Sequence, residues 1–368
     1  MTDRRRPTRE AIQVRPTVKD VARRAGVSAK TVSNVINGHV FVRPETKARV
    51  EAALGELGYV PNLSARALRN GRSGVVALAL PDLATPYSAE TAHHFVEVAH
   101  ERGWAVQIEE TGTEHGRERH LLSRARAHLV DGLVLNPVAL AGSAIDEAGP
   151  LPPVVLIGEV EQSRVDQVWV DSVVAARDMT AHLIAEGHRR IAVVGAPDVL
   201  DHAAARLRVQ GYREALDAAG IERDPTLEIP CDDWSPDGAS AAVRGFLSRW
   251  SLPDAIFCFT DSMAIGTLGV LWAAGHSVPS DVSVAGFDDI ADGRHAVPPL
   301  TTVSFDKRAF AQQAFTLLEA RMSTPGRPAR RVTVSHTLVA RASTAPRAAR
   351  VPHTTVPEAA DAPNVGLA

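Results

Sequence analysis

The chain has 368 residues, 45% of them hydrophobic, so it is long enough for two or three domains with large cores, and global disorder is excluded. Its net charge of −3 hides an asymmetry: residues 1–72 contain 15 Lys and Arg against 6 Asp and Glu, whereas the remainder contains 25 against 37. A basic head on an acidic body is what nucleic-acid binding by the head alone requires.

Cysteine usage and hydropathy exclude several further classes. The two cysteines, Cys231 and Cys258, have no CxxC spacing and no clustered histidines, so we expect neither disulfides nor a metal site. Residues 1–16 carry charge but no apolar run, and no stretch approaches 18 consecutive apolar residues. We therefore expect no signal peptide and no membrane span.

Residues 17–37, TVKDVARRAGVSAKTVSNVIN, have the pattern of two short helices joined by a tight turn. Thr17 can cap the first helix, with Asp20 able to cap back, and Ser28 can cap the second. Gly26 supplies the turn, because glycine enters the left-handed region without steric cost. Helices in this arrangement present the second helix to the major groove of DNA.

The second helix has an apolar face that begins with Val32 and a polar face opposite to it. The polar face is small and basic, and it consists of Ala29, Lys30, Ser33 and Asn34. Such a face suits contact with base edges and phosphates. An ordinary amphipathic helical hairpin would show the same pattern, so this stretch alone leaves both interpretations open.

A third helix from Pro44 completes a small domain over residues 17–60. Residues 61–72 then have the pattern of a helix of about ten residues, which is too short to be stable alone in water. Two interpretations remain. The segment is either a flexible basic linker or a hinge helix that forms only with a partner chain and DNA, with Leu68 wedged into the minor groove.

From Val75 onward, apolar strands alternate with helices, which predicts parallel sheets with helices on both faces. The strands are too many for one sheet, so we expect a body of two lobes within residues 73–345. The expected segments are about 73–171 and 304–322 for the first lobe, and about 172–303 and 323–345 for the second. We expect residues 1–16 and 346–368 to be disordered tails.

The order of these parts resembles the LacI–GalR family of bacterial transcription regulators over about residues 17–345. DVARRAGVSAKTVSNVINGH is similar to the family's headpiece signature, and YVPNLSARAL is similar to its hinge helix. Further stretches resemble successive signatures of its body: EGHRRIAVVGA, RLRVQGYREAL, FTDSMAIGTL, VSVAGFDD and PPLTTV. The resemblance implies a small all-α helix-turn-helix headpiece and an α/β body like a type I periplasmic binding protein, with two parallel-sheet lobes.

The resemblance also implies which residues contact DNA. Ala29, Lys30 and Asn34 occupy the positions by which family members choose their operators. Most relatives have Arg where this chain has Asn34. Asn can bind adenine bidentately or contact a phosphate, whereas Arg favours guanine, so the operator sequence stays open. Leu68 matches the hinge leucine that kinks the central step of a palindromic site. The other expected DNA-contacting or capping residues are Thr17, Ser28, Thr31, Ser33, Asn37, Asn62 and Ala65.

Ligands of such folds bind between the lobes, at the carboxyl ends of the strands. The polar and aromatic residues expected there are Asp82, Tyr87, Asn136, Asp171, Arg208, Trp234, Asp261 and Asp288. Carboxylates, an amide and a guanidinium can pair with ligand hydroxyls, and the aromatic faces can stack on a ring. Arg208 and Asp288 lie at the family's most dependable ligand-contacting positions. Asp288 and Asp261 also suit a structural role, because an Asp after a strand often caps the next element.

We therefore expect a homodimeric repressor of carbohydrate genes, located in the cytoplasm with the nucleoid, that leaves a palindromic operator when a small sugar binds. A purine-like corepressor is one alternative, and a solute-binding protein without DNA function is another. No GxGxxG or P-loop motif follows a strand and no GxSxG elbow occurs, so we expect neither a cofactor nor an enzyme. The neighbouring Asp288 and Asp289 would point to opposite faces of a strand, which is a poor arrangement for acid–base catalysis.

Overall fold

The computed structural model describes residues 16–37, 41–59, 72–112, 115–127, 129–138, 145, 149–160, 162–198 and 202–347. These residues fall into two units that divide between Ser73 and Gly74. Within the described ranges, no helix combines the length and the apolar character needed to cross a bilayer.

The described residues of the first unit form three helices, α1 (Val18–Ala25), α2 (Ala29–Asn37) and α3 (Pro44–Glu56). Thr17 and Asp20 form the capping box that the sequence predicts, and Gly26 adopts φ 66°, the left-handed conformation that ends α1. All three helices contribute to one small core, which consists of Val21, Ala22, Ala25, Val32, Val50 and Ala53. The helix-turn-helix arrangement predicted from the sequence is therefore confirmed.

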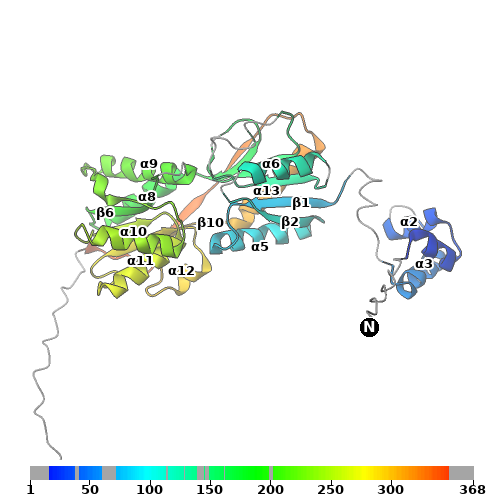
Figure 1. The fold of residues 1–368 in the computed structure, drawn as a ribbon, viewed down its shortest axis with the longest axis horizontal. Helices are drawn as coiled ribbons and strands as arrows, with labels where there is room; N and C mark the ends of the chain where they lie inside the picture. The colour runs from blue at the N-terminus through cyan, green and yellow to red at the C-terminus, as the bar shows by residue number, and fades with distance from the viewer. Residues whose placement is uncertain are drawn as a thin grey trace, which may run out of the picture. The chain divides into compact units, whose positions relative to one another are not determined.

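The first lobe of the second unit, which contains the strands labelled β1 and β2 in Figure 1, is built on a six-stranded parallel sheet of order β11-β5-β4-β3-β1-β2. Its strands are β1 (Val75–Leu80), β2 (Ala105–Glu110), β3 (Gly132–Leu135), β4 (Val154–Ile157), β5 (Asp166–Val170) and β11 (Arg331–Val334). Helices α5 (Pro86–Glu101) and α13 (Lys307–Ser323) pack together on one face, and α6 (His115–Arg126) covers the other. Alternate residues of β1 therefore enter two separate cores.

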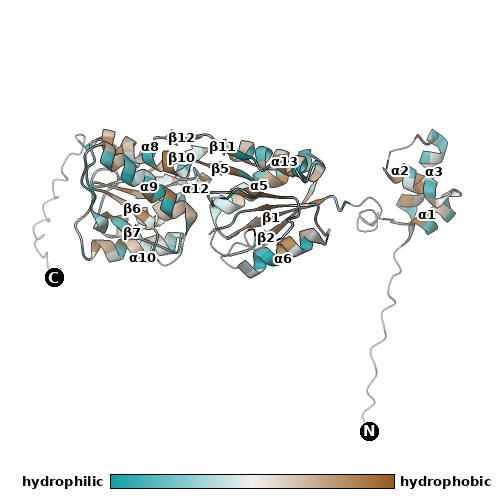
Figure 2. Ribbon diagram, turned by 90° about the horizontal axis from the view of Figure 1, so that it is seen from above, coloured by the Kyte–Doolittle hydropathy of each residue, from teal (hydrophilic) through white to brown (hydrophobic). Residues whose placement is uncertain are grey.

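The second lobe has a six-stranded sheet of order β12-β10-β9-β8-β6-β7, in which only the edge strand β12 is antiparallel to its neighbour. Its strands are β6 (Ile191–Ala196), β7 (Glu228–Pro230), β8 (Ala255–Cys258), β9 (Ser283–Phe287), β10 (Thr301–Phe305) and β12 (His336–Val339). Its helices are α8 (Ser172–Ala185), α9 (Ala203–Ala218), α10 (Pro236–Leu247), α11 (Asp261–Ala273), the short α12 (Ala291–His295) and the 3₁₀ turn η1 (Pro225–Leu227). Figure 2 shows the apolar residues concentrated in the strands that these helices cover.

The chain passes between the lobes three times, each time through one residue that separates two elements. Asp171 lies between β5 and α8, Asp306 between β10 and α13, and Ser335 between β11 and β12. The third crossing corrects the lobe boundaries predicted from the sequence, which assigned residues 323–345 to the second lobe. Strand β11 belongs to the first lobe, because it pairs with β5 in the first sheet. The stretch RVTVSHTLVAR looks like one strand, since a one-residue crossing leaves its pattern unbroken.

Glycines allow the paired helices of the second lobe to approach closely. A Cβ atom on Gly211 of α9 would lie 2.1 Å from the carbonyl oxygen of Val173 in α8. A Cβ atom on Gly266 of α11 would lie 2.1 Å from the carbonyl oxygen of Pro236 in α10. Both obstacles are backbone atoms in a close-packed interior, so neither position accommodates a side chain.

Candidate functional site

The polar face of α2 is built as the sequence predicts. Ser28 Oγ accepts a hydrogen bond from Thr31 N at 3.1 Å, and the two hydroxyl groups lie 2.9 Å apart at the start of the helix. The other side chains of this face are exposed or partly exposed: Ala29, Lys30, Ser33 and Asn34. Val32, on the opposite side, is fully buried. The first unit therefore presents a small, polar and basic surface along one side of its second helix.

Four of the predicted DNA contacts cannot be placed. The side chain of Asn37 lies outside the described residues, and so do Asn62, Ala65 and Leu68 of the predicted hinge. Thr17 is described, and its hydroxyl group donates to Asp20 Oδ2 at 2.6 Å within the capping box. This bond orients the exposed Thr17 hydroxyl at the positive end of α1.

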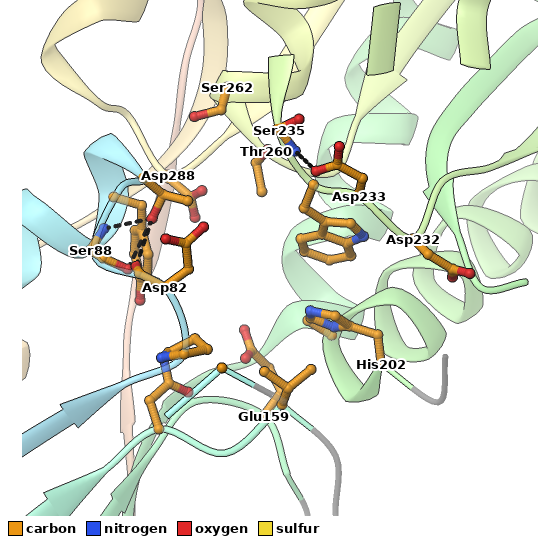
Figure 3. Close-up of a pocket in the computed structure, with 18 of the residues that line it drawn as sticks. Asp82, Ser88, Glu159, His202, Asp232, Asp233, Ser235, Thr260, Ser262 and Asp288 are labelled. Carbon is orange, nitrogen blue, oxygen red and sulfur yellow. Dashed lines mark hydrogen bonds between the residues drawn. The ribbon is translucent and has the colours of Figure 1, made fainter. Parts of the chain in front are cut away.

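In the second unit, a cavity of about 490 Å³ opens between the two lobes (Figure 3). The polar and aromatic residues that line it come from both lobes: Asp82, Thr85, Tyr87, Ser88, Glu110, Asn136, Glu159, His202, Arg208, Asp232, Asp233, Trp234, Ser235, Thr260, Ser262 and Asp288. Most of them follow the carboxyl ends of parallel strands, which is where open α/β sheets bind ligands. The cavity has the size and the mixed lining of a small-molecule site.

Arg208 lies at the inner wall of this cavity, and 5% of it is exposed. Its guanidinium group donates to the carbonyl oxygen of Phe259, to Glu159 Oε1 at 3.3 Å and to Ser172 Oγ at 3.4 Å. It also stacks on the ring of Phe287, with Cζ 3.7 Å from the ring centroid. Because Glu159 belongs to the first lobe and Phe287 to the second, Arg208 connects the two lobes at the base of the cavity.

Asp288 follows β9 and adopts φ 110°, a conformation that residues other than glycine rarely occupy. Lys307 holds this turn, since its ammonium group donates to the carbonyl oxygens of Asp288 at 2.6 Å and Asp289 at 3.2 Å. Lys307 also pairs with Glu90 of α5 at 3.1 Å. Burial raises the pKa of the Asp288 carboxyl to about 7, although the charges of Arg208 and Lys307 oppose the shift.

We expect this raised pKa to make stability depend on pH. A carboxyl group whose pKa is higher in the folded state stabilises the fold at low pH, and the stabilisation is lost as pH rises through about 7. Between about pH 5 and pH 8 the free energy of unfolding should fall by about 2–3 kcal/mol on account of Asp288. Urea unfolding of the wild type and of Asp288→Asn at both pH values measures the contribution of Asp288 to the free energy of unfolding. An equal pH dependence in the two proteins would contradict the assignment.

Trp234 and His202 form an aromatic wall on the second-lobe side of the cavity, as Figure 3 shows for the labelled His202. Their rings are stacked, with centroids 3.9 Å apart and an interplanar angle of 13°. Burial and the nearby charge of Arg208 lower the pKa of His202 to about 4, so its imidazole is neutral at physiological pH. Tyr87 from the first lobe also lines the cavity, and burial raises the pKa of its phenol.

Six of the eight predicted effector contacts line this one cavity: Asp82, Tyr87, Asn136, Arg208, Trp234 and Asp288. The other two are not among the described lining residues. Asp171 caps α8, with Oδ1 accepting from Val174 N at 3.1 Å. Asp261 is fully buried, and it accepts bonds from Thr302 Oγ1 at 2.6 Å and Ile290 N at 2.9 Å. The cap of α11 expected of Asp261 is supplied by Thr260.

Sequence reasoning missed several lining residues, above all Glu159, His202, Asp232 and Asp233. A signal for Glu159 was present, because this residue lies two positions after the end of β4, close to the place that Asn136 has after β3. Asp232 and Asp233 immediately precede Trp234 after β7 and offered the same signal. His202 precedes α9 and follows no strand directly, so only the folded structure places it against Trp234.

Comparisons with known proteins agree with this architecture. A family model described as "Bacterial regulatory proteins, lacI family" matches residues 17–62, and one described as "Periplasmic binding protein-like domain" matches residues 180–344. The HTH-type transcriptional regulator CelR of Thermobifida fusca is 38% identical over 342 residues, 88% of this chain and 97% of that protein. The ribose operon repressor of Escherichia coli (strain K12) is 33% identical over 330 residues, 89% of this chain and 99% of that protein.

Solved structures show the same likeness. A transcriptional regulator CelR–cellobiose complex superposes with a TM-score of 0.66 at 36% identity, over 89% of this chain and all (100%) of that one. The lac repressor dimer bound to operator and the anti-inducer ONPF superposes with a TM-score of 0.78 at 28% identity, over 90% of this chain and 99% of that one. The chain therefore belongs to the lacI family of bacterial regulatory proteins: it is a DNA-binding transcriptional regulator and not an enzyme.

Proposed function

We propose that this regulator represses genes of carbohydrate uptake or catabolism and that its effector is a small sugar. The observation that carries the proposal is the lining of the cavity, where carboxylates, an amide, a guanidinium group and an indole surround one space between two lobes. These groups suit the hydroxyls and the ring face of a saccharide. The CelR structure with cellobiose and the relative named ribose operon repressor support a saccharide ligand.

The proposed division of labour follows the two units. Residues 17–60 bind the major groove, residues 61–72 form a hinge helix in the minor groove, and residues 73–345 bind the effector and dimerise. The proposed DNA contacts are Thr17, Ser28, Ala29, Lys30, Thr31, Ser33, Asn34, Asn37, Asn62, Ala65 and Leu68. The proposed effector contacts are Asp82, Tyr87, Asn136, Arg208, Trp234 and Asp288.

In the proposed mechanism, two copies bind the halves of a palindromic operator at the nucleoid, in the cytoplasm. The solved lac repressor dimer bound to operator supports this arrangement. A sugar in the cleft contacts both lobes and favours one lobe arrangement, which changes the dimer interface and the spacing of the hinge helices. By linkage, operator binding must weaken the sugar by the same factor by which the sugar weakens the operator.

Fluorescence anisotropy with labelled DNA from upstream of this gene and its neighbours tests the proposal. A specific fragment should bind, and a saccharide from a panel should weaken that binding by roughly 5- to 150-fold. A panel in which no sugar changes the affinity would contradict a sugar effector. A purine that tightens binding would identify a corepressor and reverse the sign of the response.

Asn34 lies on the exposed side of α2, where a longer side chain has room. We expect Asn34→Arg to shift the preferred base in each half-site from adenine toward guanine, because Arg pairs bidentately with guanine. Selection from a randomised operator library measures the preference. Ala48→Arg, at an exposed position of α3, is the control, since it adds the same charge without changing base preference. An unchanged preference in Asn34→Arg would show that Asn34 does not contact bases.

Leu68 lies outside the described residues, and its role as the hinge wedge is a prediction from the sequence. Leu68→Ala should weaken binding to the specific operator by on the order of 1–3 kcal/mol, because the variant can no longer unstack the central base step. Binding to non-specific DNA should stay the same, since it depends on phosphate contacts. Anisotropy with both DNAs separates the two effects, and equal operator affinity would disprove the wedge.

A further inference from the structure

We infer that the cleft selects saccharides that carry no phosphate or carboxylate group and rejects their anionic derivatives. The inference rests on the proposed function, because it names the class of sugar that the same cavity accepts. Four observations support it: the charges of the lining, the bonds of its one guanidinium group, the position of the nearby ammonium group, and the state of the helix N-termini that face the cavity.

Acidic side chains dominate the lining of the cavity: Asp82, Glu110, Glu159, Asp232, Asp233 and Asp288. Among the described lining residues, Arg208 is the one Lys or Arg. The undescribed residues 113–114, 139–144 and 199–201 follow strands of the same edge, and they contain no Lys or Arg. An anionic ligand would therefore meet like charges, and such juxtapositions strongly oppose binding.

Arg208 is already engaged by the protein. Its guanidinium group bonds the carbonyl oxygen of Phe259, the Ser172 hydroxyl and the Glu159 carboxylate, and one face lies on the ring of Phe287. Glu159 balances its charge, so Arg208 can donate to a ligand hydroxyl without presenting a net positive charge. A phosphate would have to displace the Glu159 carboxylate.

Lys307 does not supply the missing charge either. It is buried behind Asp288, and its ammonium group is bonded to two carbonyl oxygens and paired with Glu90 at 3.1 Å. The pKa of Asp288 still rises to about 7, because burial and the carboxylates of Glu159 and Glu90 disfavour its negative charge. The environment that disfavours this carboxylate would also disfavour an anion on the ligand.

Helix N-termini commonly bind phosphate, and the N-terminal ends of α5, α9, α10 and α11 reach this cavity. The end of α9 has no side-chain cap, but its Ala203 N donates to the carbonyl oxygen of Val138 at 3.2 Å. Thr85, Ser235 and Thr260 line the cavity, and each caps its own helix by accepting a backbone bond, at 3.3, 3.0 and 3.2 Å respectively. Two carboxylates accept further backbone bonds just before α5 and α10: Asp82 Oδ1 accepts from Ala84 N at 2.8 Å, and Asp233 Oδ1 accepts from Ser235 N at 3.1 Å. At the ends of α5, α10 and α11, the protein's own side-chain oxygens thus occupy positions that a phosphate would otherwise use (Figure 3).

Calorimetric titration of the full-length protein with matched pairs tests the inference: cellobiose, glucose and ribose, each beside its terminal phosphate ester. The neutral sugar that binds best should bind on the order of 100-fold more tightly than its phosphorylated form. A phosphate ester that binds as tightly as its neutral partner would overturn the inference and leave the sugar effector standing. If no member of any pair binds, the proposed sugar effector itself fails.

A double variant, Asp82→Asn with Asp233→Asn, tests the cause of the selection. Asn keeps the oxygen that accepts each backbone bond and removes two negative charges, so the preference for the neutral sugar should shrink on the order of 10-fold. Asp224→Asn is the matched control, because Asp224 Oδ1 accepts the same two-residue bond from Thr226 N at 2.9 Å and is not among the cavity's described lining residues. A double variant with the wild-type preference would overturn the role of these carboxylates.

Discussion

Arg208→Ala is expected to abolish the response to effector, with effector affinity at least about 100-fold weaker and operator affinity within about threefold of the wild type. The substitution removes the donor at the base of the cavity and leaves the Glu159 carboxylate without its charge partner. It also removes the group that lies between Phe287 and the first lobe. Titration calorimetry measures the effector affinity, and anisotropy with and without the sugar measures the response.

The same helix offers the matched control for this prediction. Arg213→Ala lies five positions later in α9 and removes an Arg that pairs with Glu228 at 2.6 Å outside the cavity, so the effector response should stay intact. Arg208→Lys should give an intermediate loss, because a lysine keeps the charge but not the planar set of donors. Circular dichroism verifies that each variant is folded. A folded Arg208→Ala protein with a normal response would remove Arg208 from the binding site.

Gly266→Ala is expected to lower the free energy of unfolding by about 3–5 kcal/mol, the largest stability effect that we predict for a single methyl group. The new Cβ atom would lie 2.1 Å from the carbonyl oxygen of Pro236, so α10 and α11 would have to separate. These two helices also carry Ser235 and Thr260 at their N-terminal caps, on the cavity wall. Effector affinity should therefore fall together with stability.

Gly269→Ala, one turn later in α11, is the control for this prediction. Nothing lies within 4 Å of the Cβ position, and the residue is exposed. Because alanine favours helix more than glycine does, this variant should be more stable by up to about 1 kcal/mol. Chemical unfolding followed by circular dichroism compares the two. Equal stabilities for the two variants would mean that the close approach of α10 and α11 does not limit this position.

Local chemistry made most of the fold predictable from the sequence. The capping box of Thr17 and Asp20 and the left-handed Gly26 depend only on neighbouring residues, so both were predicted and both are present. The alternation of apolar strands with helices likewise predicts parallel sheets without knowledge of distant contacts. Residues that directly follow strands, such as Asn136, could be assigned to the cleft because parallel strands end at one edge.

Features that depend on how the lobes meet were not predictable in this way. The stacking of His202 on Trp234 joins two segments with no common sequence signal. Asp261 follows β8 and matches the pattern of a cleft residue, but its side chain turns to Thr302 and Ile290 in the interior. The position of β11 in the first sheet depends on its pairing with β5, in which Val334 lies opposite Val170, a residue 164 positions earlier in the chain.

The three one-residue crossings at Asp171, Asp306 and Ser335 also determine how such a protein can be recombined. Neither lobe is encoded by a continuous stretch of the gene. Exchanging one lobe for that of a relative therefore needs three simultaneous junctions, one at each crossing between the lobes. The first unit, by contrast, is separated from the rest by a single junction near Ser73. One genetic crossover near Ser73 can thus join a DNA-binding unit to a different effector-binding unit, whereas a new combination of two lobes needs three crossovers.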